Sequence, residues 1–346
     1  MRTYVLKRIG QAVAVLWAAY TLSFLLLSAL PGDAVHNRIQ NPDAQISPEA
    51  AKVLVHFYGL DRPLRGQYLT ALGHALQGDL GYSISTGQTV TGLIGDALPS
   101  TLKLTGLALL FGVFFAAVLA VLINYARWSW LRNVFGSVPA MFGSVPTFVV
   151  GILALQFFSF GIHLIPSSDN GSLLALIAPA ITLAFVIAAP LAQVLATSIG
   201  ATRKLPFVHV LQARGAGEGY IFGRGVLRNS SLPVLTLLGL ACGELIAGSV
   251  VTEAVFARKG IGQLTVSAVS TQDLPVLQGV VLVATLTYVT VNLLVDVAYP
   301  FLDARVLPDG KSQRVTRRKA AVLPPSARRA ASIAVARATP IEVSVR

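Results

Sequence analysis

The chain has 346 residues, of which 54% are hydrophobic and 12% are charged, and its formal net charge is +12. Soluble globular domains carry about 25% charged residues, so the composition excludes that class and predicts an integral membrane protein. The basic residues lie between apolar runs and in the C-terminal tail, which favours membrane topology and anionic lipid over nucleic acid as partners, and the single cysteine, Cys242, excludes disulfide bonds within the chain.

Six apolar runs are long enough to cross a bilayer, whose core of about 30 Å requires about 20 helical residues. They cover residues 9–30, 101–123, 134–160, 173–199, 232–252 and 277–302. The first run exceeds the apolar core of a cleaved signal peptide, about 7–15 residues, so we expect an uncleaved span. Basic residues gather after the second span, in segment 200–231 and in the tail. The positive-inside rule therefore predicts that both termini are cytoplasmic.

Residues 31–100 separate the first two spans and are too polar to be embedded in lipid. Ser47-Pro48-Glu49 is typical of a helix start, and we expect that helix to reach Gly59. A second amphipathic helix, ending at Gly78, is predicted by apolar residues that recur every four positions, namely Leu64, Tyr68, Leu72 and Leu76. This extracytoplasmic segment either supports a docking partner or only packs against the ends of the spans.

Prolines and small residues interrupt the predicted spans. The prolines are Pro139, Pro146, Pro179 and Pro190. Prolines kink helices and small residues let helices approach closely. This pattern fits a transport pathway, and it fits a passive helical bundle equally well.

The segment between the fourth and fifth spans predicts a helix, a turn and a second helix. Val208, Leu211 and Gln212 continue at helical spacing, and a second helix can run over residues 220–227. Three glycines between them, Gly215, Gly217 and Gly219, are expected to break the helix. The segment is basic, so it is either a cytoplasmic element that a partner grips or a solvated loop that only sets topology.

One carboxylate, Glu244, lies well inside the fifth span. An unpaired carboxylate is costly in a bilayer, so it must face a partner, a cavity or water. We hypothesise that it faces a translocation path and contacts a cationic part of the cargo; the alternative is a protonated or hydrogen-bonded residue at a helix contact. The five histidines are scattered and predict no metal site, and no G-x-x-x-x-G-K-[ST] phosphate loop is present.

Short strings in a fixed order carry a resemblance to a known family. The strings are Pro31-Gly32-Asp33, Gly59-Leu60-Asp61-Arg62-Pro63, Gln67-Tyr68, Gly78-Asp79-Leu80-Gly81, Leu98-Pro99-Ser100-Thr101, Val145-Pro146-Thr147-Phe148, Ala213-Arg214-Gly215, Leu227-Arg228-Asn229-Ser230-Ser231-Leu232-Pro233, Glu253-Ala254-Val255-Phe256, Gly260-Ile261-Gly262, Gln278-Gly279-Val280-Val281, Asn292-Leu293-Leu294-Val295-Asp296 and Leu302-Asp303-Ala304-Arg305. Over roughly residues 1–307 the chain resembles the membrane-spanning permease subunits of type I ABC importers, in the dipeptide/oligopeptide/nickel branch.

The resemblance implies an all-α permease with six transmembrane helices and a helical extracytoplasmic segment between the first two. Its expected parts are residues 1–30 (cytoplasmic end and first span), 31–100 (extracytoplasmic segment), 101–305 (transmembrane core, including the 200–231 coupling loop) and 306–346 (a basic, disordered tail). The coupling loop is similar to the "EAA" motif, which transmits closure of an ATP-binding subunit. Its residues are Gln212, Ala213, Arg214, Gly215, Ala216, Gly217 and Glu218, with Gly215 at the turn.

The resemblance also implies partners. They are a second homologous permease, two ATP-binding subunits (or one fused chain), an extracytoplasmic solute-binding protein and the lipid of a bacterial inner membrane. The chain itself is then no enzyme and holds no cofactor, and ATP and Mg are bound by the ATP-binding subunits. Candidates for contact with the solute-binding protein are Asp61, Arg62, Arg258 and Lys259, although the last two fit lipid headgroups equally well.

The cargo that the resemblance favours is a di- or oligopeptide. Nickel chelates or another small solute are the alternatives within the same architecture. A secondary transporter or channel is the alternative of a different class; such proteins typically show inverted repeats and ion-coupling carboxylates, and the sequence displays no convincing internal repeat.

Overall fold

The computed structural model describes residues 2–29, 48–59, 61–166 and 171–302. Within these ranges the regular structure is helical, apart from one isolated bridge between Tyr82 and Thr89, so the all-α prediction is confirmed. Residues 2–298 form one compact unit, and of the second unit only residues 299–302, the end of the last helix, are described. The 306–346 tail, with its predicted disorder, lies outside the described residues.

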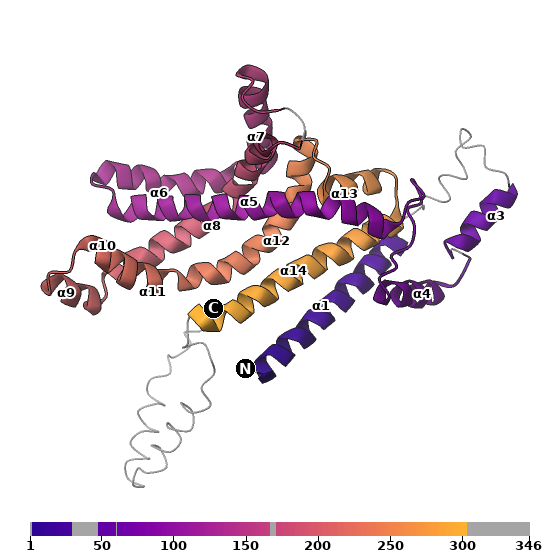
Figure 1. The fold of residues 1–346 in the computed structure, drawn as a ribbon, viewed down its shortest axis with the longest axis horizontal. Coiled ribbons are helices and arrows are strands. Elements are labelled where there is room, and N and C mark those ends of the chain that lie inside the picture. The colour runs from indigo at the N-terminus through magenta and orange to yellow at the C-terminus, as the bar shows by residue number, and fades with distance from the viewer. Residues whose placement is uncertain (1, 30–47, 60, 167–170, 303–346) are drawn as a thin grey trace, which may run out of the picture. The chain divides into compact units, whose positions relative to one another are not determined.

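Figure 1 shows the helices in chain order. The first seven elements are α1 (Arg2–Ala29), α3 (Pro48–Phe57), α4 (Leu64–Leu76), α5 (Val90–Tyr125), α6 (Ser129–Ser144), α7 (Thr147–Ala154) and the π-helix η2 (Leu155–Gly161). The remaining eight are α8 (Leu173–Arg203), α9 (Pro206–Ala213), α10 (Glu218–Tyr220), the π-helix η3 (Ile221–Leu227), α11 (Arg228–Ser230), α12 (Leu232–Val255), α13 (Ile261–Ser270) and α14 (Leu274–Leu302).

Five of the described helices, α1, α5, α8, α12 and α14, are long and apolar enough to cross a membrane, and a bent pair of helices gives a sixth span when the pair is counted as one. The prediction of an all-α protein with several spans is thus confirmed, and the count of six is reached with the bent pair. The second span is longer than expected, because α5 begins at Val90 rather than at residue 101. Thr89 caps it by accepting a hydrogen bond from the backbone N–H of Gly92, and Pro99 is accommodated inside the helix.

The third predicted span, residues 134–160, is not one continuous helix. It consists of α6 and α7–η2, which meet at an angle of 99° (Figure 1). The break falls at Val145-Pro146, where Val145 has an extended backbone (φ −99°, ψ 123°). The ring of a proline disfavours helical geometry at the preceding residue, and proline has no N–H to continue the helix.

The core lies between α5, α8 and α12. Leu104, Leu183, Ile187 and Leu245 are buried there among many alanines. Close approach of α5 to α8 depends on Gly112, because a Cβ at that position would overlap the side chain of Ile187. Small residues at helix contacts are how membrane helices maximise packing where no hydrophobic effect drives association.

The two helices predicted within residues 31–100 are present as α3 and α4. α3 begins at Pro48, as its sequence predicts, and the chain after α4 turns at Gly78, which has a φ of +82°. Tyr68 of α4 contacts α1: its hydroxyl lies 2.7 Å from the Thr21 Oγ1, and its ring packs edge-on against Phe24. These contacts fix α4 to the first span.

Candidate functional site

The predicted coupling loop forms a helical elbow. α9 starts at Pro206 and ends at Ala213, and Gly215 follows with a φ of +76°, a backbone conformation that favours glycine. The turn is closed by hydrogen bonds from the Gly215 N–H to the Gln212 carbonyl (2.9 Å) and from the Ala216 N–H to the Leu211 carbonyl (3.1 Å). We call residues 206–227 the elbow.

Only one of the three glycines in this turn needs to be glycine. Gly217 has an ordinary extended backbone (φ −67°), and Gly219 lies inside α10. The expectation that all three glycines break the helix is therefore corrected: the second helix already begins at Glu218. It continues as the π-helix η3 and ends in α11.

The elbow is anchored to the core by its apolar side. Val208, Ile221 and Val226 are buried in the core cluster shared with α5 and α8. Phe207 packs against Gly225, where a Cβ would lie 3.0 Å from the ring. The Phe222 ring meets the Tyr125 ring at 5.3 Å, so the elbow is fixed to the end of α5.

A basic residue strengthens this attachment. The guanidinium of Arg203, at the end of α8, lies 4.2 Å from the centre of the Tyr125 ring and donates a hydrogen bond to the Asn124 carbonyl. Thr202, its neighbour, accepts a hydrogen bond from the buried Ser230 hydroxyl of α11 (3.1 Å). Arg203 thus ties the end of α8 to α5, and Ser230, just beyond the elbow, ties α11 to α8.

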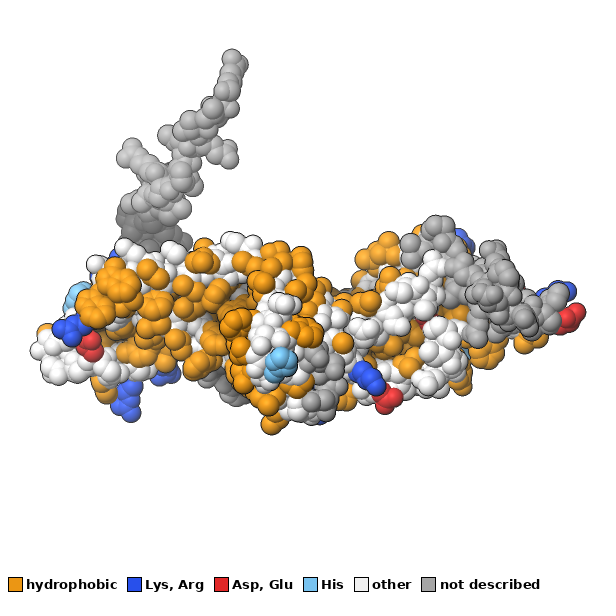
Figure 2. Space-filling view, turned by 90° about the horizontal axis from the view of Figure 1, so that it is seen from above, with side chains coloured by type: hydrophobic (Ala, Val, Ile, Leu, Met, Phe, Trp, Pro, Cys, Tyr) orange, Lys and Arg blue, Asp and Glu red, His pale blue; other side chains and the backbone are white. Residues whose placement is uncertain are grey.

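The tip of the elbow is open to its surroundings. Six of the seven predicted coupling residues are exposed, namely Gln212, Ala213, Arg214, Gly215, Gly217 and Glu218, whereas Ala216 is half-buried. Two large apolar side chains beside them, Val210 and Tyr220, are 51% and 52% exposed. Figure 2 shows basic side chains next to apolar ones at the left, where α9 and α10 lie. The tip therefore combines charge with apolar surface, as protein interfaces do.

A buried carboxylate closes the opposite end of α12. Glu253 is fully buried and accepts hydrogen bonds from the Thr101 hydroxyl (2.6 Å) and the Gly262 N–H (2.7 Å). The Ile261 N–H in turn donates to the Thr101 hydroxyl oxygen (2.8 Å). A Cβ at Gly260 would overlap the Glu253 carboxylate, and so the loop needs a glycine there. We call Thr101, Glu253 and residues 260–262 the lock; it joins α5, α12 and α13.

Arg258 belongs to the same end of the bundle and is only 6% exposed. Its guanidinium donates hydrogen bonds to the Ala175 carbonyl of α8 and the Ser100 hydroxyl of α5, both 3.3 Å. Burial corrects the expectation that Arg258 faces a docked protein or lipid headgroups. Lys259 is exposed and remains a candidate.

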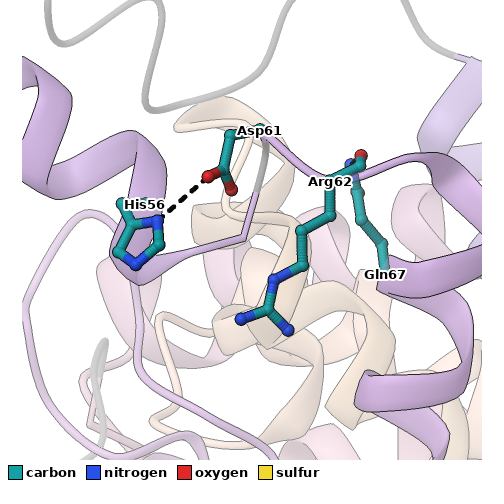
Figure 3. A network of polar contacts seen from close by, with 4 residues as sticks. All are labelled: His56, Asp61, Arg62 and Gln67. Carbon is teal, nitrogen blue, oxygen red and sulfur yellow. Dashed lines mark hydrogen bonds and ion pairs between the residues drawn. The ribbon is translucent and has the colours of Figure 1, made fainter.

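Asp61 and Arg62 are exposed on the connection between α3 and α4 (Figure 3). The Asp61 Oδ2 lies 2.9 Å from the His56 Nδ1, and this hydrogen bond holds the pKa of the Asp61 carboxyl below its usual value. Arg62 extends separately from that pair, and its backbone carbonyl accepts a hydrogen bond from the Gln67 amide (2.8 Å). Both charged side chains are thus available to a partner.

Glu244 is exposed in the middle of α12, and among the described residues none donates a hydrogen bond to its carboxylate. The alternative of a residue hydrogen-bonded between helices of this chain therefore has no hydrogen bond in its support among the described residues. The described residues also bring together no group of three or more His, Cys, Asp or Glu that could hold a metal ion.

Asp273 is a structural residue that the sequence interpretation missed. It is buried before α14, and its Oδ2 accepts hydrogen bonds from the Ser83 hydroxyl (2.6 Å), the Ser85 hydroxyl (2.9 Å) and the Ser85 N–H (3.0 Å). The signal available was its position as a helix cap before Leu274-Pro275. No pattern in the sequence indicates that Ser83 and Ser85 are its hydrogen-bond donors.

Comparison with known proteins decides the family. Residues 90–308 match the family described as "binding-protein-dependent transport system inner membrane component". The chain belongs to this family. The predicted resemblance to ABC importer permeases is confirmed, and this permease is a multi-pass membrane subunit of an ATP-driven importer, in which separate ATP-binding subunits hydrolyse ATP.

Similar proteins agree with that assignment. This permease is 31% identical to the dipeptide transport system permease protein DppB of Lactococcus lactis subsp. cremoris, 34% identical to a putative peptide permease protein of Brucella suis and 30% identical to the glutathione transport system permease protein GsiC of Escherichia coli. Each match covers 88% of this chain and 99% of the relative. The inward-facing MetNI methionine ABC transporter has a similar fold, with a TM-score of 0.52 at 16% identity over 61% of this chain and 96% of that one.

Proposed function

We propose that this permease forms half of a translocation pathway for di- or oligopeptides in a bacterial inner membrane. A second, similar permease supplies the other half. The peptide cargo is supported by relatives named for dipeptides, peptides and glutathione, which match nearly the whole length of the chain. Both termini and the elbow lie in the cytoplasm in this proposal, in accord with the basic residues of segment 200–231.

The elbow is the part that receives mechanical work. Its tip, residues 212–218, fits the groove of an ATP-binding subunit, and two such subunits, or one fused chain, serve the permease pair. The observation that carries this proposal is the combination of an exposed tip and a buried base: Val210 and Tyr220, on either side of the tip, are exposed to a partner, while Val208 and Val226 are buried in the core. Force on the tip is therefore transmitted to α5 and α8.

The helical bundle uses that force to open the translocation pathway to one side of the membrane at a time. ATP and Mg are bound by the ATP-binding subunits, and closure of those subunits draws the two elbows together. A packed core responds as a rigid body and rocks between two states, so the cavity opens outward when the elbows approach. A solute-binding protein delivers cargo at the outer face, where Asp61, Arg62 and Lys259 are exposed.

Reconstitution tests this function. We expect proteoliposomes that contain this permease, its partner permease and the ATP-binding subunits to take up a radiolabelled dipeptide only with ATP and the loaded solute-binding protein. Omission of the ATP-binding subunits should abolish uptake. Uptake by this chain alone, driven by a proton or sodium gradient, would instead identify a secondary transporter and contradict the proposal.

A further inference from the structure

One face of α12 is left uncovered along its whole length. Its exposed residues follow one another at intervals of three or four, which places them on a single stripe. The stripe consists of Pro233, Thr236, Leu240, Glu244, Ala247, Val251 and Ala254. No other residue of α12 is exposed.

The remaining faces of α12 are covered by this chain. Ala241 and Leu245 are buried in the core with α5 and α8. A Cβ at Gly248 would lie 2.9 Å from the Leu183 side chain of α8, and one at Gly243 would lie 2.7 Å from the Tyr288 ring of α14. Within the described residues, the stripe is thus the face of α12 left for water, lipid or another subunit.

Glu244 is the central residue of this stripe, and it also lies halfway along α12. It is twelve residues after Leu232 and eleven before Val255, which is about 17 Å from either end of the helix. A bilayer core is about 30 Å thick, so the carboxylate lies near its centre. An ionised group in contact with lipid at that depth carries a large penalty, and functional membrane proteins place such groups toward an aqueous path instead.

We propose that Glu244 is a charge filter for cargo: its carboxylate faces the aqueous path between the two permeases and favours peptides of net positive charge over neutral and anionic ones. This inference rests on the proposed function and adds a selectivity to it. The class of cargo follows from charge complementarity, because a lone carboxylate attracts an ammonium or guanidinium group and repels a second carboxylate.

The surroundings of Glu244 favour selection by charge over recognition of shape. Leu240 and Ala247, one turn away on either side, are apolar and offer no side-chain hydrogen bond. A single charge between apolar residues attracts or repels the cargo according to the cargo's net charge. The low dielectric of the surrounding membrane strengthens this electrostatic interaction. Such a site suits peptides of varied sequence, because it does not require the peptide to bind in one fixed orientation.

Uptake of three dipeptides of different charge tests the filter. The full transporter is reconstituted with its solute-binding protein saturated by Ala-Lys, Ala-Gln or Ala-Glu, so that capture does not limit the initial rate. We expect the wild type to transport Ala-Lys fastest and Ala-Glu slowest. Glu244→Gln should lower the ratio of Ala-Lys to Ala-Gln uptake by about tenfold, the change expected for loss of a single favourable charge contact, and Glu244→Lys should invert the order.

Two matched variants separate charge from packing. Glu244→Asp keeps the charge and should keep the order of the three peptides. Leu240→Gln places an uncharged amide on the same stripe and should leave the ratio unchanged. Equal effects of Glu244→Gln on all three peptides, or no effect, would overturn the charge filter.

A permanent ion pair between Glu244 and the second permease would give a different result from a charge filter. If Glu244→Gln released the second permease during purification while Glu244→Asp retained it, the carboxylate would pair with that subunit and the filter would be refuted. Absence of ATP-driven uptake of every dipeptide by the wild type would contradict the proposed function together with the filter. ATP-driven uptake with an unchanged ratio would contradict the filter alone.

Discussion

We expect Gly215→Val to impair the coupling of ATP hydrolysis to transport in a permease that still assembles. Gly215 has a φ of +76°, where a β-branched side chain costs about 1–3 kcal/mol of backbone strain. A Cβ at this position would have no atom within 4 Å, so the substitution strains the turn without disturbing the core. We expect dipeptide uptake and the stimulation of ATP turnover by loaded solute-binding protein to fall together.

Two controls isolate the backbone of the turn. Gly223→Val places the same side chain at an exposed glycine of η3 that has ordinary φ and open space, and it should leave uptake near the wild-type rate. Gly215→Asn should retain more uptake than Gly215→Val, because asparagine tolerates a left-handed backbone. Equal activity of Gly215→Val and the wild type would show that the turn does not carry coupling.

We expect Glu253→Ala to destabilise the end of the bundle that carries the lock. The substitution leaves the Thr101 hydroxyl and the Gly262 N–H without their buried acceptor, and each orphaned group costs about 1–3 kcal/mol. A cavity adds to the loss, so we expect a total of about 2–5 kcal/mol. Cys242 is the only cysteine and is buried, which makes the reaction of its thiol with a maleimide dye during heating a direct reporter of unfolding.

A second glutamate on the same helix provides the control. Glu244→Gln removes a carboxylate from the exposed face of α12, where it has no donor among the described residues, and should leave the unfolding temperature almost unchanged. If the Cys242 thiol of the Glu253→Ala chain reacted with the maleimide at the same temperature as in the wild type, the lock would contribute nothing to stability.

Local signals explain why much of the fold could be predicted. The start of α3 at Pro48 and the turn at Gly78 follow from capping and backbone preferences that act within a few residues. The apolar runs of α8 and α12 are long enough that a bilayer leaves no alternative to a helix. The turn at Gly215 was predictable for the same reason, since glycine tolerates a positive φ at the least cost.

The outcome at each proline was not predictable, because tertiary packing decides it. Pro139, Pro179 and Pro190 lie inside helices, whereas Pro146 separates α6 from α7 by 99°. Residues distant in sequence hold the bend: Gly151 of α7 packs against Val255 and Phe256 at the C-terminal end of α12. No residue near Pro146 carries that information.

Buried polar pairs were missed for a related reason. The hydrogen bond between Thr101 and Glu253 joins residues 152 apart in sequence, and that between Ser83 and Asp273 joins residues 190 apart. One sequence shows each residue but not its partner. The sequence alone therefore predicts an exposed position for Arg258, whereas its side chain is buried against α5 and α8.

Protection of the elbow tip tests the central proposal most directly. A cysteine is introduced at the exposed Gln212 in a Cys242→Ala chain, and its rate of modification by a water-soluble maleimide is measured with and without the ATP-binding subunits. Asn133→Cys, at an exposed position of α6, serves as the matched control. We predict that the ATP-binding subunits slow modification at residue 212 by at least about tenfold, the protection that a buried interface core provides, and leave residue 133 unaffected. Equal modification of residue 212 in the presence and absence of these subunits would contradict a coupling role for the elbow.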